Sequence, residues 1–250
     1  MLNYFKFNGG DSRDYGVLIR NKKTYNQAEK DITFEPVAGR SGDIVIDNGR
    51  YNNVEMGYGV TLFAPTLDEK NTNQNINLAY STQDLKDWLI ADGNYYKLTD
   101  CYDPDYYRMA CYSGGMEFET FTTNIAKTDI IFNCKPYKYR NDGEGLIEIS
   151  HNGEIIYNPE AHNALPYIKI YGINSHTTTM FSINGKTYTL TYVDGYVEMD
   201  CEMQNVFKGT NPKNNTFQGQ YFPTLSSGNN KINFISNIEK IEIIPKWRTI

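Results

Sequence analysis

The sequence predicts a mainly β protein with one helix, and three observations carry that prediction. The 250 residues include 21 Tyr and 12 Phe but only 2 Trp, and Tyr and Phe favour strands. The 20 Gly, with many Asn, favour turns. Short apolar runs recur between these turn residues, and a single stretch has the spacing of an amphipathic helix. At about 150 residues per domain, the length predicts one or two domains.

The first strands follow in order along the chain. Residues 2–7 and 15–19 are predicted strands on either side of a turn at Asn8-Gly9-Gly10. Residues 31–37 (DITFEPV) alternate with a period of two and predict another strand. A turn, Gly39-Arg40-Ser41-Gly42-Asp43, and the apolar run Ile44-Val45-Ile46 come next. Residues 54–64 form the longest strand candidate, and Gly57 and Gly59 within it indicate a bulge or a close backbone approach.

One helix is predicted after these strands. Leu85, Trp88 and Leu89 have the i, i+3, i+4 spacing of one helix face, and Gly93 is expected to end it. Ser81, with Asp84 three residues later, resembles an N-terminal capping box. Further strands are predicted at 95–98, 108–112, 117–122 and 124–135.

The pattern of apolar and polar residues changes at Pro136. Residues 135–145 (KPYKYRNDGEG) mix Pro, charge and Gly without a period, so they predict a linker or domain boundary. Beyond them, Asn184-Gly185 between two alternating runs is a strong hairpin signal, and Asp194-Gly195 repeats it. Short strands at close spacing continue to residue 244, a pattern typical of a β-sandwich.

Charge and hydropathy exclude several classes of protein. Lys and Arg number 24 against 30 acidic residues, a net charge of −6, which argues against a dedicated nucleic-acid binder that depends on phosphate contacts. Mean hydropathy is −0.58, and no apolar run approaches the roughly 18 residues of a membrane span. Residues 1–6 lack the basic and apolar segments of a secretory signal. We therefore expect a soluble chain with no membrane partner.

No pattern of residues predicts a cofactor or a metal centre. The four Cys include no C-x-x-C pair, and Cys111 and Cys134 are best interpreted as small buried apolar residues of a chain folded in a reducing cytoplasm. The three His lack metal-ligand spacing and are expected in solvated loops. Phosphate-binding loops of known pattern and a G-x-S-x-G nucleophile turn are also missing.

An acidic cluster and a set of aromatic residues leave two alternatives open. Asp100, Asp103 and Asp105 fit a turn with side-chain-to-backbone hydrogen bonds, although Asp103 and Asp105 could also serve as a glycosidase pair. Aromatic side chains could instead form a platform for sugar rings in a carbohydrate-binding adsorption module that contacts host cell-wall polysaccharide; they are Tyr157, Tyr167, Tyr221 and Phe222. We favour no enzymatic activity.

Four stretches in this order and spacing resemble the distal tail proteins of long-tailed phages, the siphophages. They are FKFNGGDSRDYGVLI at 5–19, VAGRSGDIVIDNGRYNN at 37–53, DLKDWLIADGNYYKLTDCYDPDYYRMA at 84–110, and the closing FPTLSSGNNKINF and IEKIEIIPKWRTI. The resemblance touches both ends and most of the first 140 residues, and it is looser in the middle of the second half.

The resemblance implies an architecture and a set of partners. Residues 1–137 would form a belt domain of strands plus a helix that assembles into a homo-hexameric ring, and residues 138–250 a galectin-like β-sandwich. Such a ring joins the tail tube to the tail tip or baseplate of the virion. It meets the major tail protein and a tail-associated hub or lysin protein, with a receptor-binding protein as a further candidate partner. DNA and the tape-measure protein pass through its lumen, and assembly takes place in the host cytoplasm.

The GRSGD turn and the residues after it are the candidate ring interface. Arg and Tyr are enriched in protein interfaces, so we expect Arg40, Asp43, Arg50 and Tyr51 at the rim between subunits. An alternative is that Arg40 caps or bridges groups within its own subunit. The negative net charge suggests a neutral-to-acidic lumen through which DNA slides without being retained.

Overall fold

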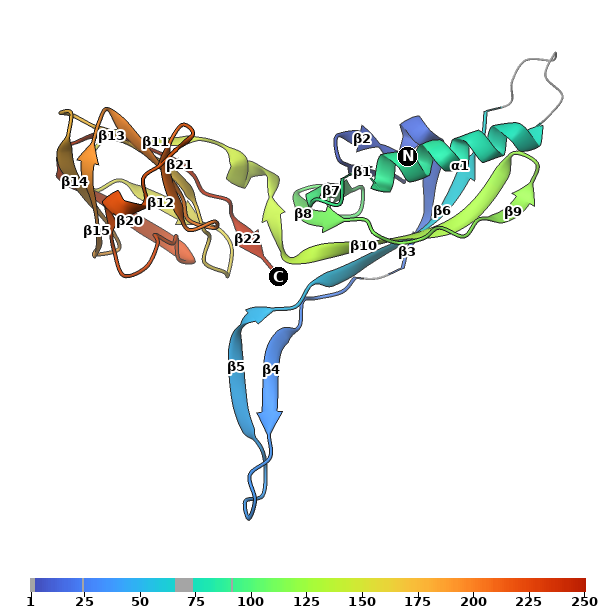
Figure 1. Cartoon of the computed structure of the whole chain (residues 1–250), viewed down its shortest axis with the longest axis horizontal. Helices are drawn as coiled ribbons and strands as arrows, with labels where there is room; N and C mark the ends of the chain where they lie inside the picture. The colour runs from blue at the N-terminus through green and yellow to red at the C-terminus, as the bar shows by residue number, and fades with distance from the viewer. Residues whose placement is uncertain (1–2, 24, 66–73, 91) are drawn as a thin grey trace. The chain divides into compact units, whose positions relative to one another are not determined.

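A computed structural model describes residues 3–23, 25–65, 74–90 and 92–250, with the side chains of 74–76 left aside. The chain forms two compact units, Met1–Lys138 with Ile250, and Tyr139–Thr249. Both are built mainly from strands, and the described residues contain a single α-helix, which confirms the predicted fold class (Figure 1).

The first unit contains one large sheet, one helix and a separate hairpin. Its sheet has the order β2-β1-β7-β8-β10-β6-β3, and β9 adds to β10. The strands pair antiparallel along β10 and β6 from Ile125 opposite Phe63 to Cys134 opposite Val54. The elements are β1 (Phe5–Phe7), β2 (Gly10–Asp11), η1 (Ser12–Tyr15), β3 (Val17–Lys22), β4 (Lys30–Glu35), β5 (Ile44–Tyr51), β6 (Val54–Phe63), α1 (Gln74–Ile90), β7 (Tyr96–Asp100), β8 (Tyr106–Cys111), β9 (Glu119–Thr122) and β10 (Ile125–Arg140), which runs on into the second unit.

Helix α1 packs on the sheet through the face that the sequence predicted. Leu85 and Leu89 are fully buried, and the Trp88 ring stacks on Tyr15 at 4.2 Å and on Phe5 at 5.7 Å. The Trp88 indole N–H also donates to the Phe7 carbonyl at 3.2 Å. Burial of each large apolar side chain contributes roughly 1.5–3 kcal/mol, so these three residues account for the docking of the helix.

One local prediction in the first unit is wrong, and another holds only in part. Ser81 does not cap the helix, because α1 already begins at Gln74 and Leu78 extends its apolar face against the core one turn earlier. Residues 135–145 were predicted as a linker or domain boundary. They are not an irregular linker, since 135–140 belong to strand β10 and the 3-10 helix η2 (Asn141–Glu144) follows directly, but the division between the two compact units falls inside them, after Lys138. Cys134 is buried as predicted, whereas Cys111 is only half-buried.

The second unit is a β-sandwich. One sheet has the order β11-β21-β13-β16-β17-β18 and the other β12-β20-β14-β15-β19, and one cluster of buried apolar residues fills the core. The elements are β11 (Ile147–Ile149), β12 (Ile155–Asn158), β13 (Tyr167–Gly172), β14 (Thr177–Ile183), β15 (Lys186–Val193), β16 (Tyr196–Asp200), β17 (Asn205–Lys208), β18 (Asn211–Pro212), η3 (Asn214–Thr216), β19 (Phe217–Gln218), β20 (Gly228–Ser236), β21 (Ile238–Ile244) and β22 (Arg248–Thr249).

The two Gly turns of the sandwich have different outcomes. Asn184 and Gly185 take positive φ angles of 50° and 81° and join the paired strands β14 and β15, so the predicted hairpin is confirmed. Asp194-Gly195 also turns the chain, but β15 and β16 lie in different sheets. That second hairpin prediction is wrong because an Asx-Gly turn also suits a crossing between sheets, which the local sequence does not distinguish.

Candidate assembly surface

The hairpin of β4 and β5 forms a two-stranded sheet of its own. Its register pairs Phe34 with Val45 and Glu35 with Ile44, and a bulge lies between Lys30 and Ile32. In the described part of the chain, neither strand pairs with a third strand. Figure 1 shows the hairpin extending away from the large sheet of the same unit.

Large apolar side chains of the hairpin are left in solvent. Phe34 is 61% exposed and Val45 is 60% exposed. Together they are part of a set of six that we call the hairpin patch: Ile32, Phe34, Val37, Ile44, Val45 and Ile46. A contiguous apolar patch on a soluble protein marks an interaction surface, and an isolated two-stranded hairpin is at best marginally stable in water.

The hairpin patch covers both faces of the two-stranded sheet. Because side chains alternate along a strand, the register places Ile32, Phe34 and Val45 on one face. Ile44 and Ile46 lie on the other face with Thr33 and Glu35. A partner that buries this patch must therefore surround the hairpin or meet it from two sides.

Polar contacts near the base hold the two strands together. Asp31 on β4 accepts hydrogen bonds from the Asn48 amide at 3.0 Å and from the Arg50 guanidinium at 2.6 Å on β5. Lys30 pairs with Asp47 at 2.5 Å. These contacts lower the pKa of both carboxyl groups, chiefly through Asn48 at Asp31 and through Lys30 at Asp47. The hairpin is thus braced by polar cross-strand contacts rather than by a core.

The structure places the four predicted interface residues at opposite ends of this hairpin. Arg40 and Asp43 lie in the exposed tip, where Gly39 and Gly42 take positive φ angles of 78° and 87°. Among the described residues, neither the Arg40 nor the Asp43 side chain has a hydrogen bond or ion pair, so the alternative of Arg40 bridging within its own subunit finds no partner there. The Arg40 backbone N–H donates to the Val37 carbonyl at 3.2 Å.

Arg50 and Tyr51 lie at the base. The Arg50 side chain is exposed but occupied by Asp31 of the same hairpin. Tyr51 is half-buried, and its ring meets Tyr137 edge-on at 5.8 Å. Tyr51 therefore ties the hairpin to its unit and Arg50 links its two strands, whereas Arg40 and Asp43 are available to a partner.

The hairpin patch was missed by reasoning from the sequence. Alternation in 31–37 predicted a strand, and nothing local indicates whether another layer of the protein covers it. A signal was present in Ile44-Val45-Ile46, because three consecutive apolar residues place apolar groups on both faces of a strand. Such a run predicts a strand contacted from both sides.

The acidic cluster serves the fold of the first unit. Asp100 accepts backbone N–H groups of Tyr102 and Asp103 at 2.9 and 3.0 Å, which confirms the predicted turn. Its other oxygen pairs with the buried Lys22 ammonium at 2.8 Å and accepts the Tyr58 hydroxyl at 2.6 Å. Burial and the Asp100 charge raise the pKa of Tyr58 well above its usual value.

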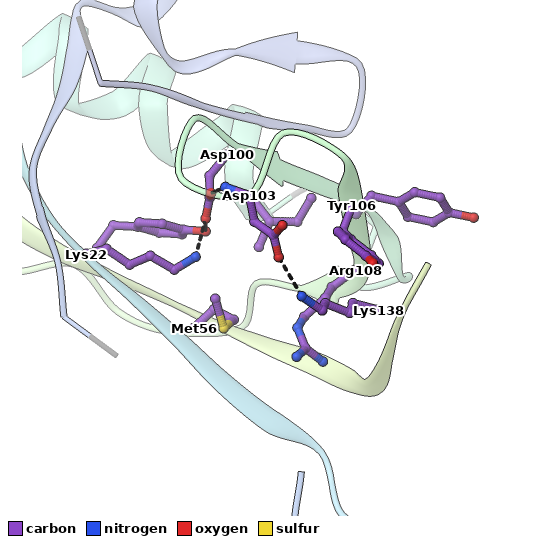
Figure 2. A pocket seen from close by; sticks show the side chains of 10 residues that line it. Lys22, Met56, Asp100, Asp103, Tyr106, Arg108 and Lys138 are labelled. Carbon is purple, nitrogen blue, oxygen red and sulfur yellow. Dashed lines mark hydrogen bonds and ion pairs between the residues drawn. The ribbon is translucent and has the colours of Figure 1, made fainter. Parts of the chain in front are cut away.

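A small pocket lies beside this cluster, and Figure 2 shows the side chains that line it. Its cavity volume is about 30 Å³, room for one or two water molecules and too small for a sugar. Asp103 pairs there with Lys138 at 2.8 Å, and Arg108 donates to the Pro136 carbonyl at 2.6 Å while burial lowers its pKa. Asp105 is exposed outside the pocket. The glycosidase alternative therefore lacks a substrate-sized cleft between its two carboxylates.

The described ranges of the chain contain no group of three or more His, Cys, Asp and Glu side chains placed to hold a metal ion. In the same ranges, no helix is long and apolar enough to cross a membrane.

Comparison with solved structures identifies the fold. The chain superposes on the crystal structure of the Dit protein of phage SPP1, described as a paradigm of the hub adsorption apparatus in phages that infect Gram-positive bacteria. The TM-score is 0.76 at 13% identity, and the match covers 100% of both chains. The chain has the Dit fold. Structures of the phage p2 baseplate in its activated conformation, with Sr and with Ca, also match over 97% of both chains, each with a TM-score of 0.54 and identities of 11% and 10%.

This chain and the SPP1 protein have a similar backbone fold but very little sequence identity. No protein-family model and no curated protein sequence matches the chain. The match to the SPP1 protein covers the full length of the chain and therefore the residues of both units. The resemblance to distal tail proteins predicted from the sequence is confirmed for the fold.

Proposed function

We propose that this chain is a structural hub protein of a phage tail and has no enzymatic role. Residues 1–137 act as the ring-forming belt, and residues 138–250 are a galectin-like sandwich that projects outward. Six copies form a ring that connects the tail tube to the tail tip or host-adsorption apparatus. The full-length match to the Dit fold supports this role.

The observation that carries the proposal is the hairpin patch. Its six apolar side chains are exposed on a hairpin that has no core of its own. Burial stabilises by about 25 cal/mol per Å² of apolar surface, so covering both faces of the hairpin provides a driving force for association. A second copy of the chain is the partner that is present whenever the protein is made.

A ring follows if the contact is between different surfaces. A hairpin that reaches from one copy to a different surface of the next makes a head-to-tail contact, and such contacts generate a closed ring when the rotation closes. Arg40 and Asp43 at the tip then provide rim contacts of opposite charge, which set orientation more than affinity. At the base of the hairpin, Arg50 joins its two strands and Tyr51 packs on Tyr137 of β10.

The proposed ring has partners along its axis and at its outside. The major tail protein meets one side and the tail-associated hub or lysin protein meets the other, with a receptor-binding protein at the periphery. DNA and the tape-measure protein pass through the lumen, where a wall without excess positive charge avoids retaining phosphate groups. Assembly occurs in the host cytoplasm, and the finished protein lies in the virion at the tail tip.

The experiment measures mass in solution. Six chains of 28.7 kDa give about 172 kDa, which light scattering distinguishes from a monomer. The variant Phe34→Ser with Val45→Ser places two hydroxyls on one face of the hairpin and is expected to shift the protein to monomers. Because both side chains are exposed in the subunit, its circular dichroism should stay unchanged.

Ile173→Ser is the matched control, since Ile173 is equally exposed but lies on the sandwich. It should leave the mass of the assembly unchanged. A wild-type chain that stays monomeric at all concentrations would contradict a self-assembling ring. A ring that persists in the double variant would place the subunit contact away from the hairpin.

A further inference from the structure

A concavity in the second unit lies at the start of β15. Its volume is about 550 Å³, within the range of small-molecule sites. It is lined by residues from three segments: Asn163, Lys186 to Tyr188 on β15, and the loop that carries Tyr221 and Phe222. None of these residues belongs to the hairpin or to the pocket of Figure 2.

Polar side chains without intramolecular partners converge on this concavity. Among the described residues, the side chains of Asn163, Lys186 and Thr187 have no hydrogen bond or ion pair. Tyr188 lines the site although it is only 5% exposed. Its hydroxyl has no hydrogen-bond partner in the described chain and is not among the fully enclosed polar atoms, so it reaches the accessible wall. A buried tyrosine hydroxyl normally finds a partner, so this hydroxyl can bond a group that enters the concavity.

Two aromatic rings complete the wall. Tyr221 is 73% exposed and lines the concavity beside the half-buried Phe222. The Phe222 ring packs on Phe217 at 4.8 Å, and a side chain at Gly219 would collide with the Phe217 ring at 2.5 Å. Packing therefore fixes Phe222, while Tyr221 keeps an open face.

The loop that carries these rings is tied at both ends. Phe217 and Gln218 form β19, which pairs with Leu190 and Thr189 of β15. Beyond the loop, Leu225 and Ala164 exchange two backbone hydrogen bonds of 2.9 and 3.0 Å. A loop fixed in this way loses little conformational entropy when a ligand binds, which favours affinity.

We propose that this concavity binds a saccharide that carries a negative charge. A sugar ring presents an apolar C–H face and a rim of hydroxyls. The first suits the open Tyr221 ring, and the second suits the amide of Asn163 and the hydroxyls of Thr187 and Tyr188. No aliphatic or acidic side chain is among the described residues that line the site. Lys186 is the only charged side chain among these described lining residues, so a uronate or a sugar phosphate is favoured over a neutral sugar.

The proposal is independent of ring formation, because every contact it uses lies within one sandwich. A protein loop is the competing occupant, and the absence of aliphatic lining from the described wall argues against it. The experiment uses the full chain on a printed glycan array. The array presents each sugar in a neutral form and in a charged form, as a uronate or a sugar phosphate. Saturation-transfer NMR then measures the affinity for the saccharide that binds.

Tyr221→Ala is expected to weaken binding about tenfold, as the loss of a central aromatic contact does. Lys186→Gln should weaken binding of the charged saccharide but leave its neutral counterpart unchanged. Tyr157→Ala is the matched control, because Tyr157 is an exposed tyrosine of the same sandwich outside the concavity. It should bind like the wild type. Light scattering compares the mass of each variant's assembly with that of the wild type and so shows whether a substitution also disturbs the ring.

Several results would overturn the proposal. An array without saturable binding to any saccharide would do so, and so would binding that Tyr221→Ala leaves intact. Equal weakening by Tyr157→Ala would place the site on a different face of the sandwich. Binding of a virion protein that depends on Tyr221, without any saccharide binding, would assign the concavity to a protein partner instead.

Discussion

Two hairpins of this chain are similar in sequence and opposite in environment. β4 and β5 pair over five positions, and β14 and β15 pair over six. Both mix apolar and polar residues along their strands, and each turn contains glycine at positive φ. In the sandwich, Phe181 is 0% exposed and opposes the buried Tyr188. In the first unit, Phe34 opposes Val45 with both side chains in solvent.

The difference lies in what covers each hairpin. β14 has β20 on its other edge, and the opposite sheet of the sandwich packs over its apolar face. β4 and β5 are both edge strands with no second layer among the described residues. Edge strands with exposed apolar side chains are a liability in a monomer and a means of assembly in an oligomer. Local pattern therefore predicts the hairpin, and only tertiary context decides its use.

The largest expected effect comes from truncating the same residue type in both hairpins. Phe181→Ala should lower the free energy of unfolding by about 3–5 kcal/mol, because it removes a buried ring and leaves a cavity. Phe34→Ala should change it by less than about 0.5 kcal/mol, as is usual for an exposed site. Urea denaturation at high dilution, where subunits are separate, measures both.

Trp88 lies in the core of the first unit and Trp247 in the sandwich core, so fluorescence reports the unfolding of both units. Equal losses in the two variants would break the comparison, since they would mean that Phe34 is covered within its own subunit. A loss in Phe34→Ala that appears only at high concentration would instead reflect assembly, because association stabilises by mass action.

The same contrast explains how much the sequence predicted. The helix face of Leu85, Trp88 and Leu89 and the Asn184-Gly185 hairpin depend on local spacing, and both were predicted. Asp194-Gly195 and the strand at 135–140 depend on which sheet receives the next strand, and neither strand path was predicted, although the division between the two units does fall inside the predicted boundary stretch 135–145. Arg40 and Asp43 were singled out because a Gly-rich turn is a local feature, and their place between subunits stays a prediction. The exposure of Phe34 and Val45 reflects a layer missing from the described residues, which no local pattern records.

A smaller effect is expected from the turn glycines. Gly185 and Gly42 have φ angles of 81° and 87°, and a Cβ at either would meet nothing within 4 Å. Replacement by Ala thus adds only the backbone strain of the left-handed region, about 1–2 kcal/mol. Gly185→Ala should lower global stability by that amount, because Asn184 beside it bonds the Lys231 N–H at 2.9 Å and the Asn230 side chain at 2.9 Å.

Gly42→Ala carries the same strain but should leave global unfolding unchanged and accelerate amide exchange in the β4–β5 hairpin. A hairpin without a core opens separately from the rest of the unit. Gly115→Ala is the control, since Gly115 has no positive φ and open space around it. A global loss in Gly42→Ala equal to that in Gly185→Ala would show that the two hairpins unfold together with their units.

The smallest effect is expected from acid. Asp31 and Asp47 have a lowered pKa, through Asn48 and Arg50 at Asp31 and through Lys30 and the Gly49 N–H at Asp47. A lowered pKa contributes stability above the unfolded value of about 3.9, and this contribution is lost as pH falls through the folded value. Protection of the β4–β5 amides in the isolated subunit should therefore decrease between about pH 4 and pH 2, as measured by hydrogen exchange corrected for intrinsic rates.

The β14–β15 amides should stay protected over the same range, because buried apolar contacts rather than exposed carboxylates hold those strands. Asp31→Asn removes the acceptor charge, so its hairpin should already be less protected at pH 7 and should depend less on pH. Assembled protein sharpens the comparison further. If neighbouring subunits cover the hairpin patch, burial replaces the exposed ion pairs as the main brace, and the acid sensitivity of the β4–β5 amides should fall toward that of the sandwich. Sensitivity that is unchanged by assembly would mean that the hairpin stays in solvent and that subunits meet elsewhere.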